Sequence, residues 1–149
     1  MMMKVGNCKV SFPGDSMGES DRVLIRRYSA DTLKCDVIQM SHHGHTGTSS
    51  EFYRRSAAEC LLFPITEIKF DEELPRQEAN RVAIEIAKEY HIASNGAAEI
   101  PLPYKFGQTK ILPDETFEDF NGIFQLWCYE YTDEYKEKLY KEFLERKNK

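Results

Sequence analysis

The fold is decided by the stretch Cys35-Asp36-Val37-Ile38-Gln39-Met40-Ser41-His42-His43-Gly44. Its first six residues are a short β-branched run, which predicts a strand over 35–40 that leads into a loop over 41–50. Ser49 or Ser50 can cap a helix that reaches about Ala58, because a serine hydroxyl accepts a hydrogen bond from a free amide of the first turn. The next apolar run, Cys60-Leu61-Leu62-Phe63-Pro64-Ile65, predicts a second strand closed by proline. The order strand, loop, helix, strand favours an α/β fold.

The flanking sequence continues this alternation of strands and helices. Upstream we expect a strand over 4–12, a turn over 13–16 and a helix over 20–29 that is capped by Ser20 or Asp21. Downstream, Leu74-Pro75 predicts the start of a helix that runs to Tyr90, since its apolar residues recur at helical spacing. Asn95-Gly96 predicts a hairpin between 91–94 and 98–103. Beyond it we expect a strand over 123–129 and a charged helix from 132 onward.

Length and composition limit the class of protein. The 149 residues suit a single domain, 1–149, and 41% hydrophobic with 12% aromatic residues is enough for a core, which excludes disorder over the whole chain. We find neither an apolar run of membrane-helix length nor a signal-peptide pattern, so we expect a cytoplasmic protein without membrane contact. The net charge of −5 makes nucleic acid an unlikely partner, except as a substrate.

The four cysteines, Cys8, Cys35, Cys60 and Cys128, include no Cys-x-x-Cys pair. Most of them lie in or beside strand-like apolar runs. We therefore interpret them as reduced, small core residues, ahead of a disulfide or a metal role.

Two motifs carry residues suited to chemistry. Gly14-Asp15 follows one predicted strand, and His42-His43-Gly44 follows another. In α/β folds functional groups are displayed where strands end and loops begin. Carboxylate and imidazole are ligands for zinc, manganese or iron, so the pair predicts a site for zinc or another divalent transition metal.

These motifs resemble a known family. Part of the sequence is similar to the C-terminal half of metallo-β-lactamase-fold hydrolases, in particular the group of the competence-type DNA-uptake hydrolase. The similar part consists of Phe12-Pro13-Gly14-Asp15, a helix, the stretch from Leu33 to Gly44, and then Thr48-Ser49-Ser50-Glu51-Phe52. The likeness continues weakly to about residue 103. It implies half of an αββα sandwich over 1–103, a mixed sheet with flanking helices, and an extension over 104–149 made of a strand and a C-terminal helix.

The resemblance also implies roles for individual residues. Asp15 would bridge two metal ions, and His42 or His43 would be a terminal ligand; His42 is favoured, because neighbouring side chains on an extended segment point to opposite sides. The other histidine would hold the loop or bind a substrate phosphate. His45 and Ser49 are candidates for substrate binding, although Ser49 is more simply a helix N-cap. His91 is interpreted as a structural residue between a helix and a strand.

One departure from the family pattern limits these roles. The upstream "H-x-H-x-D-H" half, which supplies most family ligands, is not in this sequence, and Leu74 occupies the place of a further family histidine. Three alternatives stay open: another chain completes the site, a mononuclear site uses Asp15, His42 and a neighbour such as His45, or the fold persists without metal.

The function predicted from the sequence is a metal-dependent hydrolase, or a truncated fragment of one, with phosphodiester-type substrates by analogy. The alternative is a non-catalytic half-fold that serves assembly or binding. Because half of a sandwich leaves an apolar sheet face or an unpaired edge, we expect a homodimer or a complementary chain.

Overall fold

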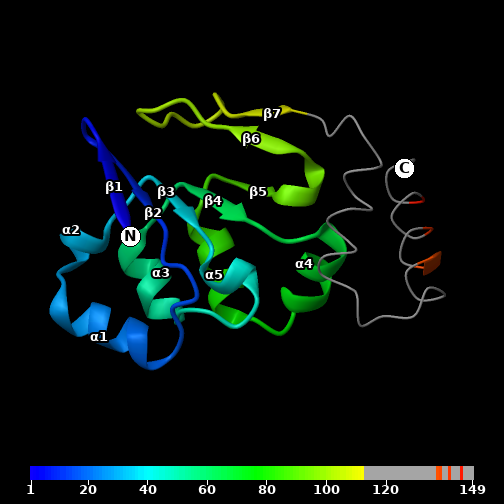
Figure 1. Cartoon of the computed structure of the whole chain (residues 1–149). Helices are drawn as coiled ribbons and strands as arrows, with labels where there is room; N and C mark the ends of the chain where they lie inside the picture. The colour runs from blue at the N-terminus through cyan, green and yellow to red at the C-terminus, as the bar shows by residue number, and fades with distance from the viewer. Residues whose placement is uncertain (113–136, 139–140, 142–144, 146–149) are drawn as a thin grey trace. The chain divides into compact units, whose positions relative to one another are not determined.

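The computed structural model describes residues 1–112, 137–138, 141 and 145 (Figure 1). Met1–Pro113 form one compact unit, and Asp114–Lys149 are a separate unit. The strand expected over 123–129 lies outside the described residues, as does most of the helix expected from 132. The described residues 137, 138, 141 and 145 are helical.

The first unit is built on a five-stranded mixed sheet. Its strands, in spatial order, are β1 (Met2–Val5), β2 (Cys8–Ser11), β3 (Val37–Gln39), β4 (Cys60–Phe63) and β5 (Glu89–Ile92). The pair β1–β2 is antiparallel, whereas β2 to β5 run parallel to one another. Parallel neighbours need crossover connections, and helices supply them here. The predicted mixed α/β sheet with flanking helices is therefore confirmed.

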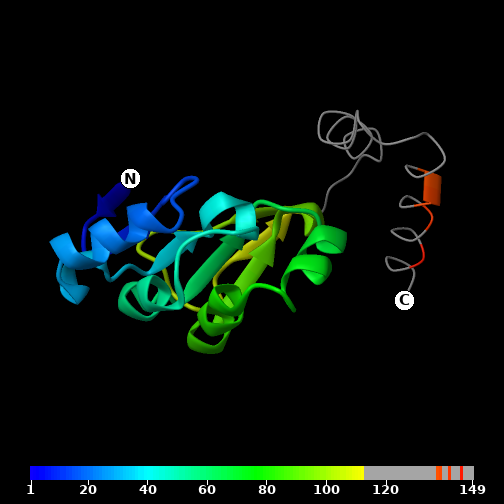
Figure 2. The ribbon, with the colours of Figure 1, turned by 90° about the horizontal axis from the view of Figure 1, so that it is seen from below.

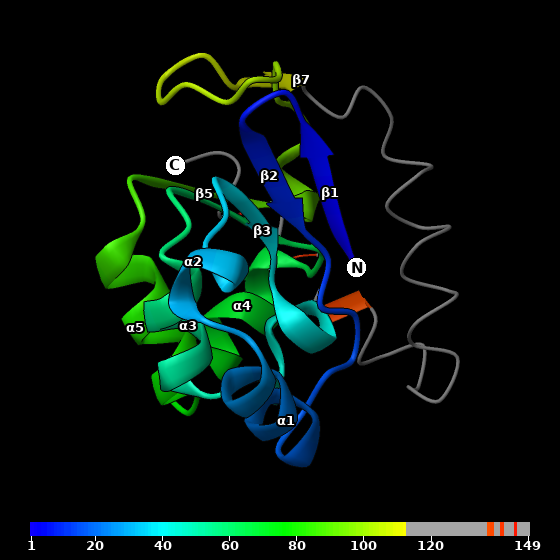
Figure 3. The same cartoon turned by 90° about the vertical axis from the view of Figure 1, so that its left-hand side faces the viewer.

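The helices lie on one face of this sheet and a two-stranded sheet lies on the other (Figures 1 and 3). The helices are α1 (Glu19–Arg27), α2 (Ala30–Leu33), α3 (Ser50–Ser56), α4 (Glu67–Glu73) and α5 (Glu78–Ile86). Two short 3₁₀ segments, η1 (Ser41–Gly44) and η2 (Ala93–Asn95), follow β3 and β5, and the small sheet pairs β6 (Ala97–Glu99) with β7 (Lys110–Leu112). Figure 2 shows the helical layer from below.

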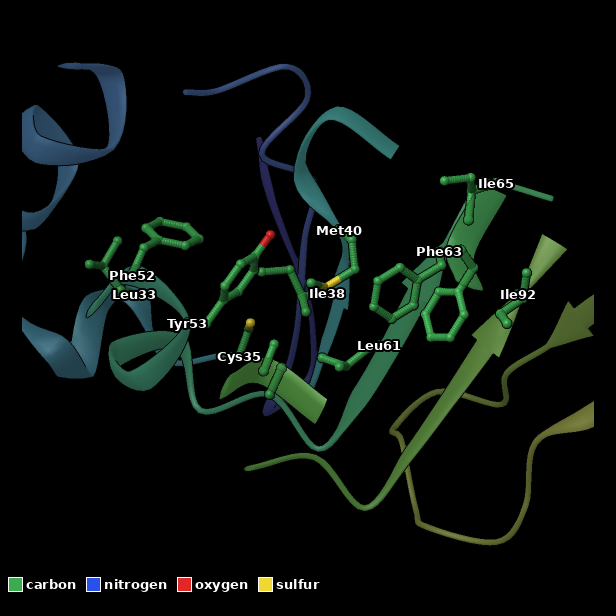
Figure 4. Packing of buried hydrophobic residues seen from close by; sticks show 13 residues of the cluster. Leu33, Cys35, Ile38, Met40, Phe52, Tyr53, Leu61, Phe63, Ile65 and Ile92 are labelled. Carbon is green, nitrogen blue, oxygen red and sulfur yellow. The ribbon is translucent and has the colours of Figure 1, made fainter. Parts of the chain in front are cut away.

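The main core lies between the sheet and the helices (Figure 4). Ile38, Leu61 and Phe63 project from the strands and are almost completely buried, and Phe52 and Tyr53 of α3 pack in the same cluster. Burial of each large apolar side chain contributes about 1.5–3 kcal/mol, so this layer dominates the stability of the unit.

The opposite face of the sheet carries a smaller core. Its buried members are Cys8, Val10, Val37 and Cys60, and the partly buried residues packed against it include Ile100 and Tyr104. The chain thus places its own side chains on the face that the half-sandwich interpretation left for a partner.

The strand expected over 4–12 is a hairpin. β1 and β2 pair with Val5 opposite Cys8, and the chain turns at Gly6-Asn7. Gly6 has a φ of 60°, which a glycine adopts without steric cost. All of β1 is exposed, because it is an edge strand with no partner beyond it among the described residues.

The helix expected from Leu74-Pro75 to Tyr90 was wrong at both ends. The segment before Pro75 is itself helical, α5 begins only at Glu78, and the chain becomes strand β5 at Glu89. The apolar residues near 90 continue the helical spacing by coincidence, since Tyr90 and Ile92 are strand residues, and Ile92 belongs to the main core. His91 therefore lies within a strand of the sheet.

The predicted hairpin at Asn95-Gly96 was also wrong. The chain does turn there, with Gly96 at a φ of 120°, but β5 belongs to the large sheet and β6 pairs with β7. A Cβ at position 96 would clash with the Leu112 carbonyl oxygen, so Gly96 permits the close approach of the two small strands. None of the helices that the structure describes combines the length and apolarity needed to cross a membrane.

Candidate metal centre

The two predicted motifs lie side by side. β2 and β3 are parallel neighbours, so their carboxyl ends meet at one edge of the sheet, where the Gly14-Asp15 turn and η1 follow. Three hydrogen bonds join the segments: His42 N–H donates to the Gly14 carbonyl (2.9 Å), and the Ser41 hydroxyl contacts the carbonyls of Gly14 (3.0 Å) and Ser16 (2.6 Å). One backbone hydrogen bond and the Ser41 side chain thus join the turn that contains Asp15 to the histidine loop.

The histidine loop has an unusual backbone. His42 and His43 have φ values of 47° and 61°, a region that costs a residue with a Cβ about 1–2 kcal/mol. Tertiary contacts hold this conformation: the Asn80 side chain donates to the Gly44 carbonyl at 2.6 Å, and Gly44 lies against the Phe63 ring. Strain of this kind is concentrated at functional sites, which makes the loop a candidate site.

The His42 ring is oriented by the loop itself. Its Nδ1 lies 2.9 Å from the Thr46 carbonyl oxygen and 3.4 Å from the Thr46 hydroxyl. A carbonyl can only accept, so the shorter contact requires a proton on Nδ1 and leaves the lone pair on Nε2. Metal-binding histidines are held in this way by an oxygen acceptor behind the ring.

His45 lies beside His42. The two ring centroids are 5.7 Å apart, whereas two imidazoles on one zinc, each bound at about 2.1 Å, place their centroids about 5 Å apart. Nδ1 of His45 lies 3.7 Å from Glu73 Oε1, so a carboxylate stands near this nitrogen at a distance beyond a direct hydrogen bond. Burial lowers the pKa of His45 below its ordinary value, although the nearby Glu73 carboxylate opposes the shift. The ring is therefore neutral at pH 7, the state that binds metal.

The other predicted site residues are less closely arranged. Asp15 is exposed in its turn, and the His43 ring lies with its centroid 6.3 Å from that of His42. Ser49 is the N-cap of α3: its hydroxyl accepts from Phe52 N–H at 3.4 Å, and its own N–H donates to buried Asp21. The N-cap interpretation of Ser49 is confirmed, whereas Asp21 binds Ser49 instead of capping α1, whose N-cap is Gly18.

A second group of ligand-type residues was missed in the sequence. Cys60, Glu89 and His91 are the only three His, Cys, Asp or Glu residues of the described part whose ligand atoms all lie within 4.8 Å of one another. Sequence reasoning missed them because it placed Glu89 in a helix. With strand β5 recognised, Glu-x-His would have shown two ligands on one face, because alternate strand residues point the same way.

The described thiols are free and lie in the core, as predicted. Cys8, Cys35 and Cys60 are buried, and each belongs to one of the two cores. Cys128 lies outside the described residues.

No protein-family model, curated protein or solved structure matches this chain.

Proposed function

We propose that this chain is a metal-dependent hydrolase related to the later half of the metallo-β-lactamase fold, with a mononuclear zinc site formed by Asp15, His42 and His45. The observation that carries the proposal is the pair of adjacent imidazoles, with the ring of His42 oriented by the Thr46 carbonyl. Three protein ligands with a fourth open position are typical of catalytic zinc sites. Of the alternatives for ligation, this arrangement needs no further chain.

The residues would divide the work as follows. His42 and His45 would hold the metal, His42 through Nε2, because the Thr46 carbonyl fixes its tautomer. Asp15 is exposed and would turn toward the histidines on binding, a movement that its position in a surface turn allows. A divalent zinc ion supplies Lewis acidity and lowers the pKa of bound water, which is the chemistry of hydrolysis. Phosphodiesters are proposed as substrates from the family resemblance alone.

The test is zinc binding by the full chain carrying Cys60→Ser. This substitution removes the thiol of the Cys60, Glu89 and His91 group, so that this group does not add to the zinc measured. Equilibrium dialysis followed by elemental analysis should give about one zinc per chain, because three ligands are sufficient for a catalytic site. His42→Ala and His45→Ala should each reduce zinc below about a tenth of an equivalent. Asp15→Ala should also lower the zinc content, whereas its matched control Asp31→Ala, which alters an exposed aspartate on α2, should leave binding unchanged.

Equal zinc content in all of these variants would contradict the proposal. Hydrolysis of bis(p-nitrophenyl) phosphate, measured with and without zinc, tests the reaction itself. We expect zinc-dependent turnover that His42→Ala abolishes.

One observation favours a second candidate, a non-catalytic assembly module. β1 is an exposed edge strand, and its residues Met2, Met3 and Val5 remain 37–40% exposed. Edge strands with apolar side chains are templates for pairing with another chain. Zinc binding without turnover, together with a stable dimer, would favour this candidate over the hydrolase.

A further inference from the structure

We propose that Cys60, Glu89 and His91 form a second, structural zinc site, which ties β4 to β5 on the sheet face opposite the helices. The site is independent of the proposed hydrolase centre, because it lies at the amino-terminal end of the parallel strands, whereas the histidine loop follows their carboxyl ends.

Strand register brings the three residues together. Cys60 of β4 is directly opposite Glu89 of β5, and His91 lies two residues further along β5 on the same face. The three ligand atoms all lie within 4.8 Å of one another, and Nε2 of His91 is 3.7 Å from Oε1 of Glu89. Two ligand atoms on one tetrahedral zinc lie about 3.4 Å apart, so small side-chain rotations complete the geometry.

A buried nitrogen gives an independent reason to place an ion here. Nε2 of His91 is buried and has no hydrogen-bond partner among the described residues, because its distance to Glu89 is too long for a hydrogen bond. A buried polar atom without a partner is uncommon and requires an explanation such as an ion. This nitrogen lies near the Glu89 carboxylate and the Cys60 thiol.

Charge balance favours a divalent, borderline-soft cation. The Thr109 hydroxyl donates to Oε1 of Glu89 at 2.7 Å, which holds the carboxylate in place beside Cys60 and His91. On binding, Zn²⁺ would displace the proton of the Cys60 thiol, and the resulting thiolate with the Glu89 carboxylate would balance the charge of the ion, so that the buried complex is neutral overall. Sulfur, nitrogen and oxygen donors together select zinc over magnesium or calcium.

The burial of the group indicates a structural role. Cys60 is fully buried, and the side chains of Glu89 and His91 are each only 15% exposed. Tyr104 packs against the same face, and the Thr109 hydroxyl contacts Glu89, so an ion here would also fasten the segment between β6 and β7 to the large sheet.

The test is titration of the full-length chain with Co²⁺, a spectroscopic substitute for zinc. Thiolate ligation gives a sulfur-to-cobalt charge-transfer band, which the sulfur-free Asp15, His42 and His45 centre cannot produce. We expect this band with the wild-type chain and with His42→Ala, so failure of one proposal is distinguishable from failure of the other. Cys60→Ser should abolish the band, and Cys35→Ser, which removes another buried thiol, should retain it.

His91→Gln supplies a second variant in case Cys60→Ser does not fold. It leaves the buried thiol in place, and it should weaken Co²⁺ affinity at least about tenfold, since it removes a ligand and not merely an outer contact. Absence of the band in the folded wild-type chain would overturn the proposal. Persistence of the band in Cys60→Ser, or unchanged affinity in His91→Gln, would do the same.

Discussion

Gly44→Ala tests most sharply how the histidine loop is attached to the sheet. Gly44 has a φ of 91°, and an added Cβ would lie 2.6 Å from Cδ1 of Phe63. The Phe63 ring cannot easily move away, because it is 1% exposed and its centroid lies 4.9 Å from that of Phe70. The positive φ costs alanine about 1–2 kcal/mol, and overpacking of the core adds about 1–3 kcal/mol.

Gly107→Ala is the matched control. Gly107 has a φ of 78°, but nothing lies within 4 Å of an added Cβ, so only the backbone cost applies. Gly44→Ala should therefore lose about 1–3 kcal/mol more of the free energy of unfolding than Gly107→Ala. Urea denaturation followed by far-UV circular dichroism measures the difference. Losses that agree within about 0.5 kcal/mol would refute the contact between the loop and Phe63, because an added Cβ meets a neighbouring side chain at position 44 and nothing at position 107.

Three further results are expected. Asn80→Ala should lower the free energy of unfolding by about 1–3 kcal/mol in the same assay, because it leaves the buried Gly44 carbonyl without its 2.6 Å donor; an unchanged value would remove Asn80 from the support of the loop. In metal-free protein the urea midpoint should fall as the pH rises above about 9. Burial raises the pKa of the Cys35 and Cys60 thiols from 9.0 to about 12, so the unfolded chain loses these protons first and gains stability relative to the folded chain. A midpoint that does not change up to about pH 10.5 would contradict this. Light scattering at micromolar concentration should show a dimer, whereas a monomer would argue against pairing through β1.

Part of the fold follows from local sequence. The strand at 37–39, the Ser49 cap and the strand at 60–63 were predicted close to their positions, since β-branched runs and serine caps act over a few residues. The Glu78–Ile92 segment was not, because its apolar residues fit a helical period while tertiary pairing with β4 makes 89–92 a strand. The Asn95-Gly96 turn was found, but the choice of strand partners depends on contacts distant in sequence.

The candidate site shows the same division. Asp15 and the histidine loop were predicted to form one site at two strand ends, and the hydrogen bonds to Gly14 and Ser16 join the two segments. The pairing of His45 with His42 depends on a positive-φ backbone that residue types alone do not indicate. The Cys60 group required the correct register of β4 and β5.

The most direct test of the proposed hydrolase centre is the position of zinc in crystals of the full-length chain. Anomalous diffraction at the zinc absorption edge should place an ion about 2.1 Å from Nε2 of both His42 and His45, with the Asp15 carboxylate completing the protein ligands. A map with no zinc at these two nitrogens, in crystals grown with the metal in excess, would contradict the account.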